Sequence, residues 1–179
     1  MDSSSLLNAR AGAGQRQASV QRTLLALLDA DRPAASIELD AFSDLRKDQQ
    51  EQIRLVWADL GAERRRELVT ALVEFAEDHV DANFGAIYRW LLEDADPRIR
   101  TQAIEGLWED EDVRLISPLI RCLERDSDPD VRAAAALSLG RYLLLGEYGQ
   151  IDASAVHRIT AALMHAYRSG DEDVWVRRR

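Results

Sequence analysis

The chain has 179 residues, of which 46% are hydrophobic and 31% are charged. This length suits one domain with a sizeable core, and the composition is too apolar for wholesale disorder and too polar for a membrane protein. A formal net charge of −9 argues against sequence-independent binding to the phosphates of nucleic acids. The single cysteine, Cys122, cannot form an internal disulfide, and no secretory signal opens the sequence, so we expect a cytoplasmic location.

The N-terminal part of the chain changes from polar to periodic. Residues 1–19 are rich in Ser, Ala, Gly, Gln and Arg, which predicts a disordered or weakly helical tail that contributes nothing to the fold. Apolar periodicity begins at Val20 and stops before Pro33, so residues 20–47 are expected to form a short helix and an irregular apolar connector. From Asp48 onward the apolar spacing is helical almost without break, and we see no convincing strand. The chain is predicted to be all-α.

A five-residue pattern, D-P-x-[IV]-R, opens two predicted helices that start 32 residues apart. The Asp is placed to accept the free amides of the helix as an N-cap, and the Pro occupies the first helical position, where a missing N–H has no cost. The Arg can bond a carboxylate of its own turn or of the next repeat. The positions of this structural repeat motif, with a looser third copy at the end, are Asp96, Pro97, Arg100, Asp128, Pro129, Arg132, Asp173 and Arg177.

A helix pair of this length, with that pattern at the start of the second helix, resembles a HEAT repeat of the bacterial PBS-lyase type. The resemblance covers residues 48–179 and is strongest over residues 82–140. It implies an all-α, right-handed α-solenoid of antiparallel helix pairs over residues 48–179, with an incomplete last repeat. It also suggests the N-terminal part of a longer solenoid. The resemblance is specific for fold rather than function, because this fold hosts scaffolds, adaptors, lyase subunits and a few enzymes.

No pattern in the sequence predicts a catalytic, cofactor or metal site. The repeated aspartates are interpreted as caps, since a catalytic residue rarely needs a copy in every repeat. His157 and His165 lie eight residues apart without a third ligand at metal-binding spacing. The His-Glu pairs that carry iron in HEAT-repeat hydroxylases are missing from the sequence, and Cys122 has no nearby histidine. We therefore expect a protein that is not an enzyme and needs no cofactor.

Two surface features leave alternatives open. The tryptophans Trp57 and Trp90 fit core packing better than an aromatic ligand pocket, whereas Trp108 and Trp175 are less clearly core residues. The acidic stretch 109–112 is either a solvated turn cluster or a negative rim that attracts a basic partner segment. The basic runs 64–66 and 177–179 are too short to make a duplex-DNA channel in so acidic a chain.

The leading functional hypothesis is a non-enzymatic protein-protein interaction scaffold that uses the concave face of the solenoid. Its partner would be a protein or peptide, without nucleic acid or membrane. The alternatives are a bilin-lyase-like or chaperone subunit that handles a tetrapyrrole, and a nucleic-acid-binding HEAT module. The candidate partner-binding positions, which lie off the buried stripe of the second helices, are Arg98, Thr101, Gln102, Glu105, Asp130, Ala134 and Ser138.

The sequence stops only a few residues into the expected last helix. We therefore predict that the flank of the helix over residues 153–167 that carries Val156, Ile159, Leu163 and Tyr167 is incompletely covered. Such a flank suggests a fragment of a longer solenoid or self-association through the C-terminal end.

Overall fold

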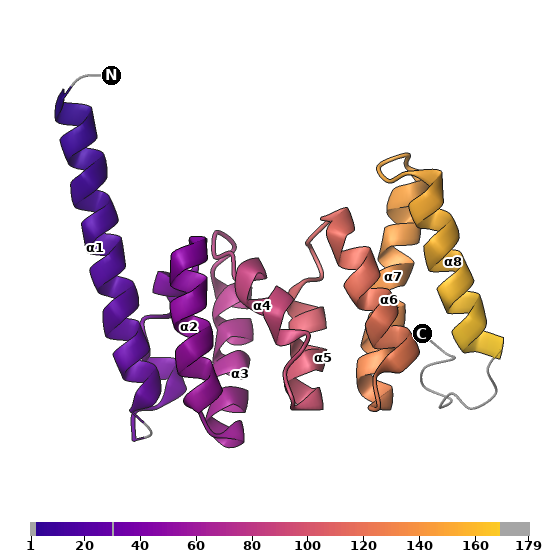
Figure 1. The fold of residues 1–179 in the computed structure, drawn as a ribbon, viewed down its shortest axis with the longest axis horizontal. Coiled ribbons are helices and arrows are strands. Elements are labelled where there is room, and N and C mark those ends of the chain that lie inside the picture. The colour runs from indigo at the N-terminus through magenta and orange to yellow at the C-terminus, as the bar shows by residue number, and fades with distance from the viewer. Residues whose placement is uncertain (1–2, 30, 169–179) are drawn as a thin grey trace. The chain divides into compact units, whose positions relative to one another are not determined.

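The computed structural model describes residues 3–29 and 31–168 of the chain. Within these ranges there are eight α-helices, three short 3-10 helices and no strand (Figure 1). The prediction of an all-α protein is therefore confirmed. The chain divides into two compact units, Met1–Ala86 and Ile87–Arg179. Helix α4 (Gly85–Leu91) crosses the boundary between them.

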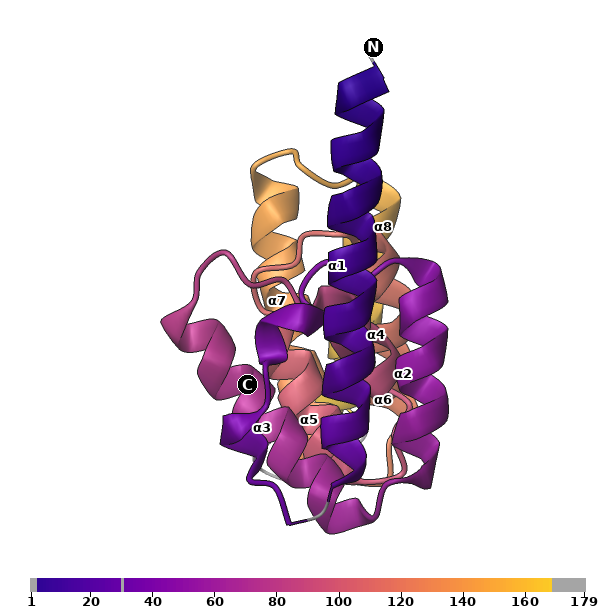
Figure 2. The ribbon, with the colours of Figure 1, turned by 90° about the vertical axis from the view of Figure 1, so that its left-hand side faces the viewer.

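The first unit is built from α1 (Ser3–Leu28), α2 (Lys47–Asp59) and α3 (Ala62–Asp78), with two 3-10 turns, η1 (Ala34–Ser36) and η2 (Leu39–Phe42), in the connector. Helix α1 lies beside α2 in Figure 2. The apolar residues Ile37, Leu39 and Phe42 of the connector are all buried. Of its two turns, η2 packs against α1 and η1 packs against α3.

Helix α1 begins well before Val20, so the expected boundary between a tail and a helix is corrected. Gln17, in the segment expected to contribute nothing, accepts hydrogen bonds from Arg46 Nη2 at 3.1 Å and from Gln49 Nε2 at 3.2 Å. Arg16 Nη2 donates to the Ser43 carbonyl at 2.6 Å. Amide and guanidinium groups hold this part of α1 in place, and apolar periodicity does not detect such contacts.

The basic run 64–66 has a structural role at the end of α1. The guanidinium of Arg64 donates to the carbonyl oxygens of Ala26 and Leu27 at 3.4 Å and of Asp29 at 3.0 Å. It also pairs with Glu67 at 3.1 Å. The last carbonyls of a helix have no partner within the helix, and a basic side chain at that end supplies donors and complements the dipole. Arg64, which belongs to α3, therefore supplies hydrogen-bond donors to the C-terminal carbonyls of α1.

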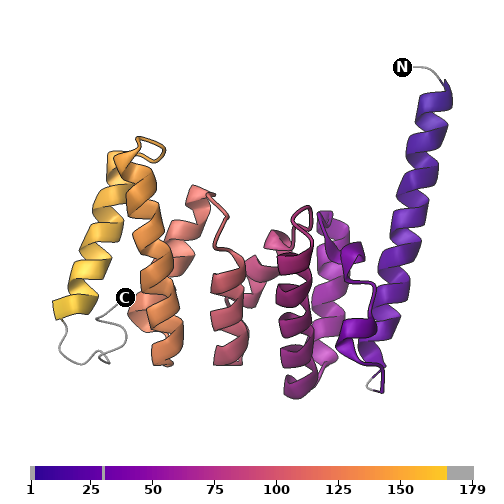
Figure 3. The same ribbon diagram turned by 180° about the vertical axis from the view of Figure 1, so that it is seen from behind.

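The second unit continues with α5 (Pro97–Gly106), η3 (Val113–Leu115), α6 (Ile116–Arg125), α7 (Pro129–Glu147) and α8 (Ala153–Arg168). Helix α7 packs against α5, α6 and α8, and its contact with α8 is visible from both sides in Figures 1 and 3. Large side chains that are less than 2% exposed come from every α-helix of this unit: Ile87, Leu91, Ile99, Ile104, Ile116, Leu119, Leu123, Leu139, Tyr142 and Ile159.

Helix α8 buries a stripe of small side chains and one isoleucine. Its buried residues are Ala155, Ile159, Ala162 and Ala166, which recur at helical spacing. On the flank that we expected to be incompletely covered, Val156 and Leu163 are half-buried and Tyr167 is exposed, whereas Ile159 is buried.

The C-terminal end leaves two predictions open. Asp173, Trp175 and Arg177, and the basic run 177–179, lie outside the described residues. Self-association through this end stays a prediction.

In the part of the chain that the structure describes, no helix is both long and apolar enough to cross a bilayer.

Candidate protein-interaction surface

Three Asp-x-Asp turns, at 94–96, 110–112 and 126–128, precede helical segments of the second unit. In each turn the first carboxylate accepts the backbone N–H of the second aspartate, at 2.9, 2.9 and 3.0 Å respectively. The second carboxylate accepts the N–H two residues further on, at 3.0, 2.9 and 2.9 Å. Sequence reasoning found only two of the second aspartates. The even spacing of 16 residues between the turns is the signal that would have found all three.

Arg100 links two of these turns. Its Nε and Nη2 atoms donate to both carboxylate oxygens of Asp126, at 2.7 and 2.6 Å, and its Nη1 donates to the Asp94 carbonyl at 2.8 Å. Arg132 Nη1 donates to the Asp126 carbonyl at 3.0 Å, which matches the Arg100 contact one repeat earlier. Arg100 therefore bonds the next repeat, and its carboxylate partner is Asp126 rather than the motif residue Asp128.

Replacing Asp128 with alanine is expected to lower the free energy of unfolding by about 1 kcal/mol, the usual effect of losing an N-cap. Its carboxylate accepts the N–H groups of Asp130 and Val131 at the start of α7. Asp130→Ala removes an exposed acid from the same first turn without removing a cap, so a loss of only a few tenths is expected. Urea denaturation of both variants measures the difference, and equal losses would contradict a capping role for Asp128.

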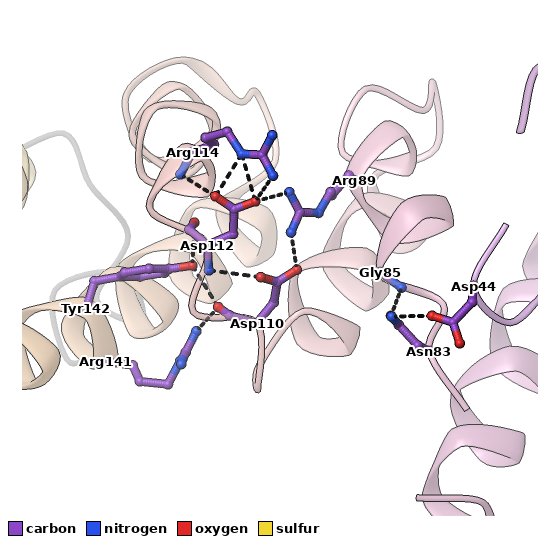
Figure 4. Close-up of polar contacts among 9 residues, drawn as sticks. All are labelled: Asp44, Asn83, Gly85, Arg89, Asp110, Asp112, Arg114, Arg141 and Tyr142. Atoms are coloured by element: carbon purple, nitrogen blue, oxygen red, sulfur yellow. Dashed lines mark hydrogen bonds and ion pairs between the residues drawn. The ribbon is translucent and has the colours of Figure 1, made fainter. Parts of the chain in front are cut away.

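The acidic stretch 109–112 lies in the connection between α5 and α6, where it is tied to three helical segments (Figure 4). Arg89 of α4 pairs with Asp110 at 2.5 Å and with Asp112 at 2.6 Å. Arg114 pairs with Asp112 at 2.6 Å. The two aspartates are therefore neutralised within the fold, whereas Glu109 and Glu111 remain exposed. Glu109 and Glu111 are therefore the two acidic residues of this stretch that remain solvated.

The hydrogen bond from Arg114, and then that from Arg89, hold the pKa of Asp112 well below its ordinary value, against the opposing effect of partial burial. A carboxyl group with a lowered pKa in the folded state stabilises the fold above its unfolded pKa of about 3.9 and loses that contribution as the pH falls.

Asp112→Asn keeps a side-chain oxygen that can accept the backbone N–H of Arg114, but it removes the negative charge. We expect this substitution to lower the free energy of unfolding by about 1 kcal/mol at pH 7. The loss is modest because Arg114 is solvent-exposed. The difference from the wild type should shrink as the pH is lowered from 4 towards 2. Denaturation across this pH range tests the effect, with Glu109→Gln as an exposed control. A difference independent of pH would exclude the charge as its cause.

The positions expected to bind a partner do not all lie at the surface. Arg98, Glu105 and Asp130 are exposed, and Thr101, Gln102 and Ala134 are half-buried. Thr101 Oγ1 donates to the Pro97 carbonyl at 3.1 Å within α5.

Ser138 is only 2% exposed, and its assignment to the binding surface is corrected. The residue one repeat earlier is Gly106, where an added Cβ would lie 2.5 Å from the Tyr88 ring. The Tyr88 ring therefore leaves no room for a side chain at Gly106, and Ser138 is buried at the same position of the next repeat.

Sequence reasoning missed the exposed apolar surface of α7. Leu137, Arg141 and Leu144 follow one another at helical spacing, and the two leucines are 39% and 51% exposed. The Arg141 guanidinium lies 5.8 Å from the centre of the Trp108 ring, and Trp108 itself is 45% exposed. We call these four residues the Trp108–Leu144 patch. Helix α7 continues past the point where the equivalent helix α5 ends, through the apolar run of residues 142–145. This run was the sequence signal of additional apolar surface on α7.

Arg141 also ties the patch to the acidic stretch. Its Nη2 donates to the Asp110 carbonyl, which accepts a second hydrogen bond from the Tyr142 hydroxyl at 2.7 Å (Figure 4). The Arg141 guanidinium lies 4.9 Å from the centre of the Tyr142 ring. The connection after α5 is thus fixed against α7, and Trp108 is held beside Arg141.

The comparisons with known proteins agree with the helix-pair geometry. The family of HEAT repeats matches residues 86–179, which is more than half of the chain and coincides with the second unit. Neither the curated proteins nor the solved structures contain a significant match. With its Asp-Pro-capped second helices stacked on their neighbours, the chain belongs to the HEAT-repeat family.

Proposed function

We propose that this chain is a non-enzymatic scaffold module that binds a protein or peptide partner, with the Trp108–Leu144 patch at the centre of the binding surface. The observation that carries the proposal is the exposure of three bulky apolar side chains around one fixed arginine. Tryptophan and arginine are enriched among the residues that dominate binding energy, and contiguous exposed apolar surface marks interaction sites. HEAT repeats commonly mediate protein-protein interaction, which supports the proposal by analogy of fold.

The arginine contacts favour this proposal over a nucleic-acid module. Arg89, Arg100 and Arg114 are paired with aspartates, and Arg64 is engaged with the carbonyls at the end of α1. A phosphate-binding face needs lysine or arginine charges that are free to meet phosphates. These four charges already have partners within the fold, so they give the nucleic-acid alternative no support.

The non-enzymatic part of the proposal is supported at the single cysteine. Cys122 is buried, and burial raises the pKa of its thiol to about 11. A thiol with such a pKa is protonated at neutral pH and is a poor nucleophile.

We also propose that the protein is cytoplasmic, on the basis of its single cysteine, and that its repeats are of the bacterial PBS-lyase type, on the basis of the D-P-x-[IV]-R motif.

Site-specific photo-cross-linking in the native cells tests the proposed surface. A photoreactive amino acid at Leu137 or Leu144 is expected to give a discrete cross-linked complex with another protein. The same amino acid at Leu55 of α2, which is 73% exposed, is the control and is expected to give none. No complex from either patch position, or equal yields from Leu55, would overturn the proposal.

A further inference from the structure

We infer that the Trp108–Leu144 patch binds an amphipathic segment of the partner whose apolar side chains are flanked by lysine or arginine. This inference rests on the proposed function and adds the chemistry of the partner. It is drawn from the shape of the apolar surface, from the contacts that hold the surface in place, and from the charges at its edge.

The apolar part of the patch suits a short helical or extended segment. Leu137 and Leu144 are seven residues apart in α7, which separates them by about 10 Å along the helix axis. Arg141 lies between them in sequence, with Trp108 beside its guanidinium. An amphipathic helix presents its anchors over about two turns when they are at positions i, i+3 or i+4, and i+7. The spacing of the two leucines therefore matches the anchors of such a segment.

The patch is held in position before a partner arrives. Backbone bonds from Trp108 to Glu105 at 3.0 Å and from Asp110 to Leu107 at 3.0 Å close the end of α5. Arg89 fixes the Asp110 carboxylate, and Arg141 and Tyr142 hold its carbonyl. A surface that is already ordered loses less conformational entropy on binding. These contacts favour Trp108 as a fixed anchor.

Exposed acidic residues flank the members of the patch in the sequence. Glu105 precedes Trp108 by three residues, Glu109 and Glu111 follow it, and Glu147 follows Leu144 by three residues; all four are exposed. None of them forms an ion pair with another described residue. The single cation inside the patch, Arg141, is already engaged with Asp110 and two rings. A polar rim that complements the charges of the partner selects partners and speeds association, so this rim favours a basic one.

Three labelled synthetic peptides test this chemistry by fluorescence anisotropy. The first is a 14-residue amphipathic helix of leucine and lysine, the second carries glutamate in place of every lysine, and the third has the first composition with the leucines spread around the helix. We expect the first peptide to bind, and the other two to bind at least ten times more weakly. Equal binding of the first and third peptides, or tighter binding of the glutamate peptide, would overturn the inference.

The apolar contribution is tested without changing charge. Leu137→Gln/Leu144→Gln is expected to weaken binding of the leucine-lysine peptide about 10-fold, as for the loss of interface anchors. Leu55→Gln, at an exposed leucine of the first unit, is the control and should leave binding unchanged. Thermal unfolding of each variant confirms that these exposed positions do not alter the fold. Equal effects of the two variants would contradict the inference.

The charge contribution needs a control of equal net charge. Glu109→Gln/Glu111→Gln is expected to weaken binding of the same peptide about threefold at low salt and to reduce its salt dependence. The control is Glu74→Gln/Glu77→Gln in α3, which removes two exposed carboxylates that are distant in sequence from the patch. This control should change binding little. Equal weakening by both pairs would mean general attraction to an acidic chain and would overturn the inference.

The failures of the two proposals are distinguishable. Cross-linking at Leu137 and Leu144 without binding of the basic amphipathic peptide would leave the proposed function in place and reject the basic partner. Absence of both cross-linking and peptide binding would reject both proposals.

Discussion

Asp126→Ala is expected to lower the free energy of unfolding by about 3 kcal/mol, the largest loss from any single carboxylate of the repeat turns. The side chains of Asp126 and Arg100 are only 8% and 12% exposed, and two hydrogen bonds of 2.6 and 2.7 Å join them. The hydrogen bond to Asp126 is also the main cause of the raised pKa of Arg100. Removing the carboxylate leaves the Arg100 charge buried with carbonyl partners but without an opposite charge.

The same carboxylate has a second role, which separates this substitution from a simple loss of an ion pair. Asp126 Oδ1 accepts the backbone N–H of Asp128 at 3.0 Å and so shapes the turn that carries the N-cap of α7. Arg100→Met removes the charge from the other side but leaves this turn intact. We expect Arg100→Met to be less destabilising than Asp126→Ala.

A double-mutant cycle measures the coupling. Urea denaturation of Asp126→Ala, Arg100→Met and the double variant is expected to give a coupling energy of about 1 to 3 kcal/mol, because the two residues are in direct contact. A loss for Asp126→Ala no larger than that for Asp128→Ala would show that the ion pair contributes little, and the structural role assigned to it would be wrong.

Gly106→Ala is expected to destabilise the protein by about 2 kcal/mol, although alanine favours helices over glycine by about 1 kcal/mol. A Cβ at this position would lie 2.5, 2.7 and 2.8 Å from three carbon atoms of the Tyr88 ring. The ring is 2% exposed and is enclosed by the core. It cannot move aside without disturbing its neighbours, so the overlap outweighs the gain in helix propensity.

Gly140 provides a matched control of opposite sign. It lies in the interior of α7, and no heavy atom would come within 4 Å of an added Cβ. Gly140→Ala is therefore expected to stabilise the protein by about 0.5 to 1 kcal/mol. Thermal and urea denaturation compare the two variants, and Tyr88→Leu in the Gly106→Ala background should recover part of the loss. Changes of the same sign at both glycines would refute the packing argument.

Local patterns in the sequence were sufficient for the helical class and the repeat. Asp128 and Pro129 act within a few residues of themselves, as a cap and as the first helical residue, so their pattern identifies the start of α7. The apolar residues of the same D-P-x-[IV]-R pattern, Ile99 and Val131, are buried. The part of α1 before Val20 was missed because Arg16 and Gln17 make polar contacts there, whose partners lie in α2 and the connector before it.

The tertiary structure decided which surfaces remain exposed and which charges are paired. Ser138 has a polar side chain, but α7 packs against three helices and Ser138 lies on its buried side. Leu137 and Leu144 are apolar, yet they lie on the stripe of α7 that those helices leave uncovered. Asp126 is paired because Arg100, 26 residues earlier, is brought beside it when the two turns stack. Caps and helical periods depend on bonds within one or two turns, so the sequence alone determined them. Exposure and long-range ion pairs depend on how helices distant in the chain pack, and only the folded structure determines that.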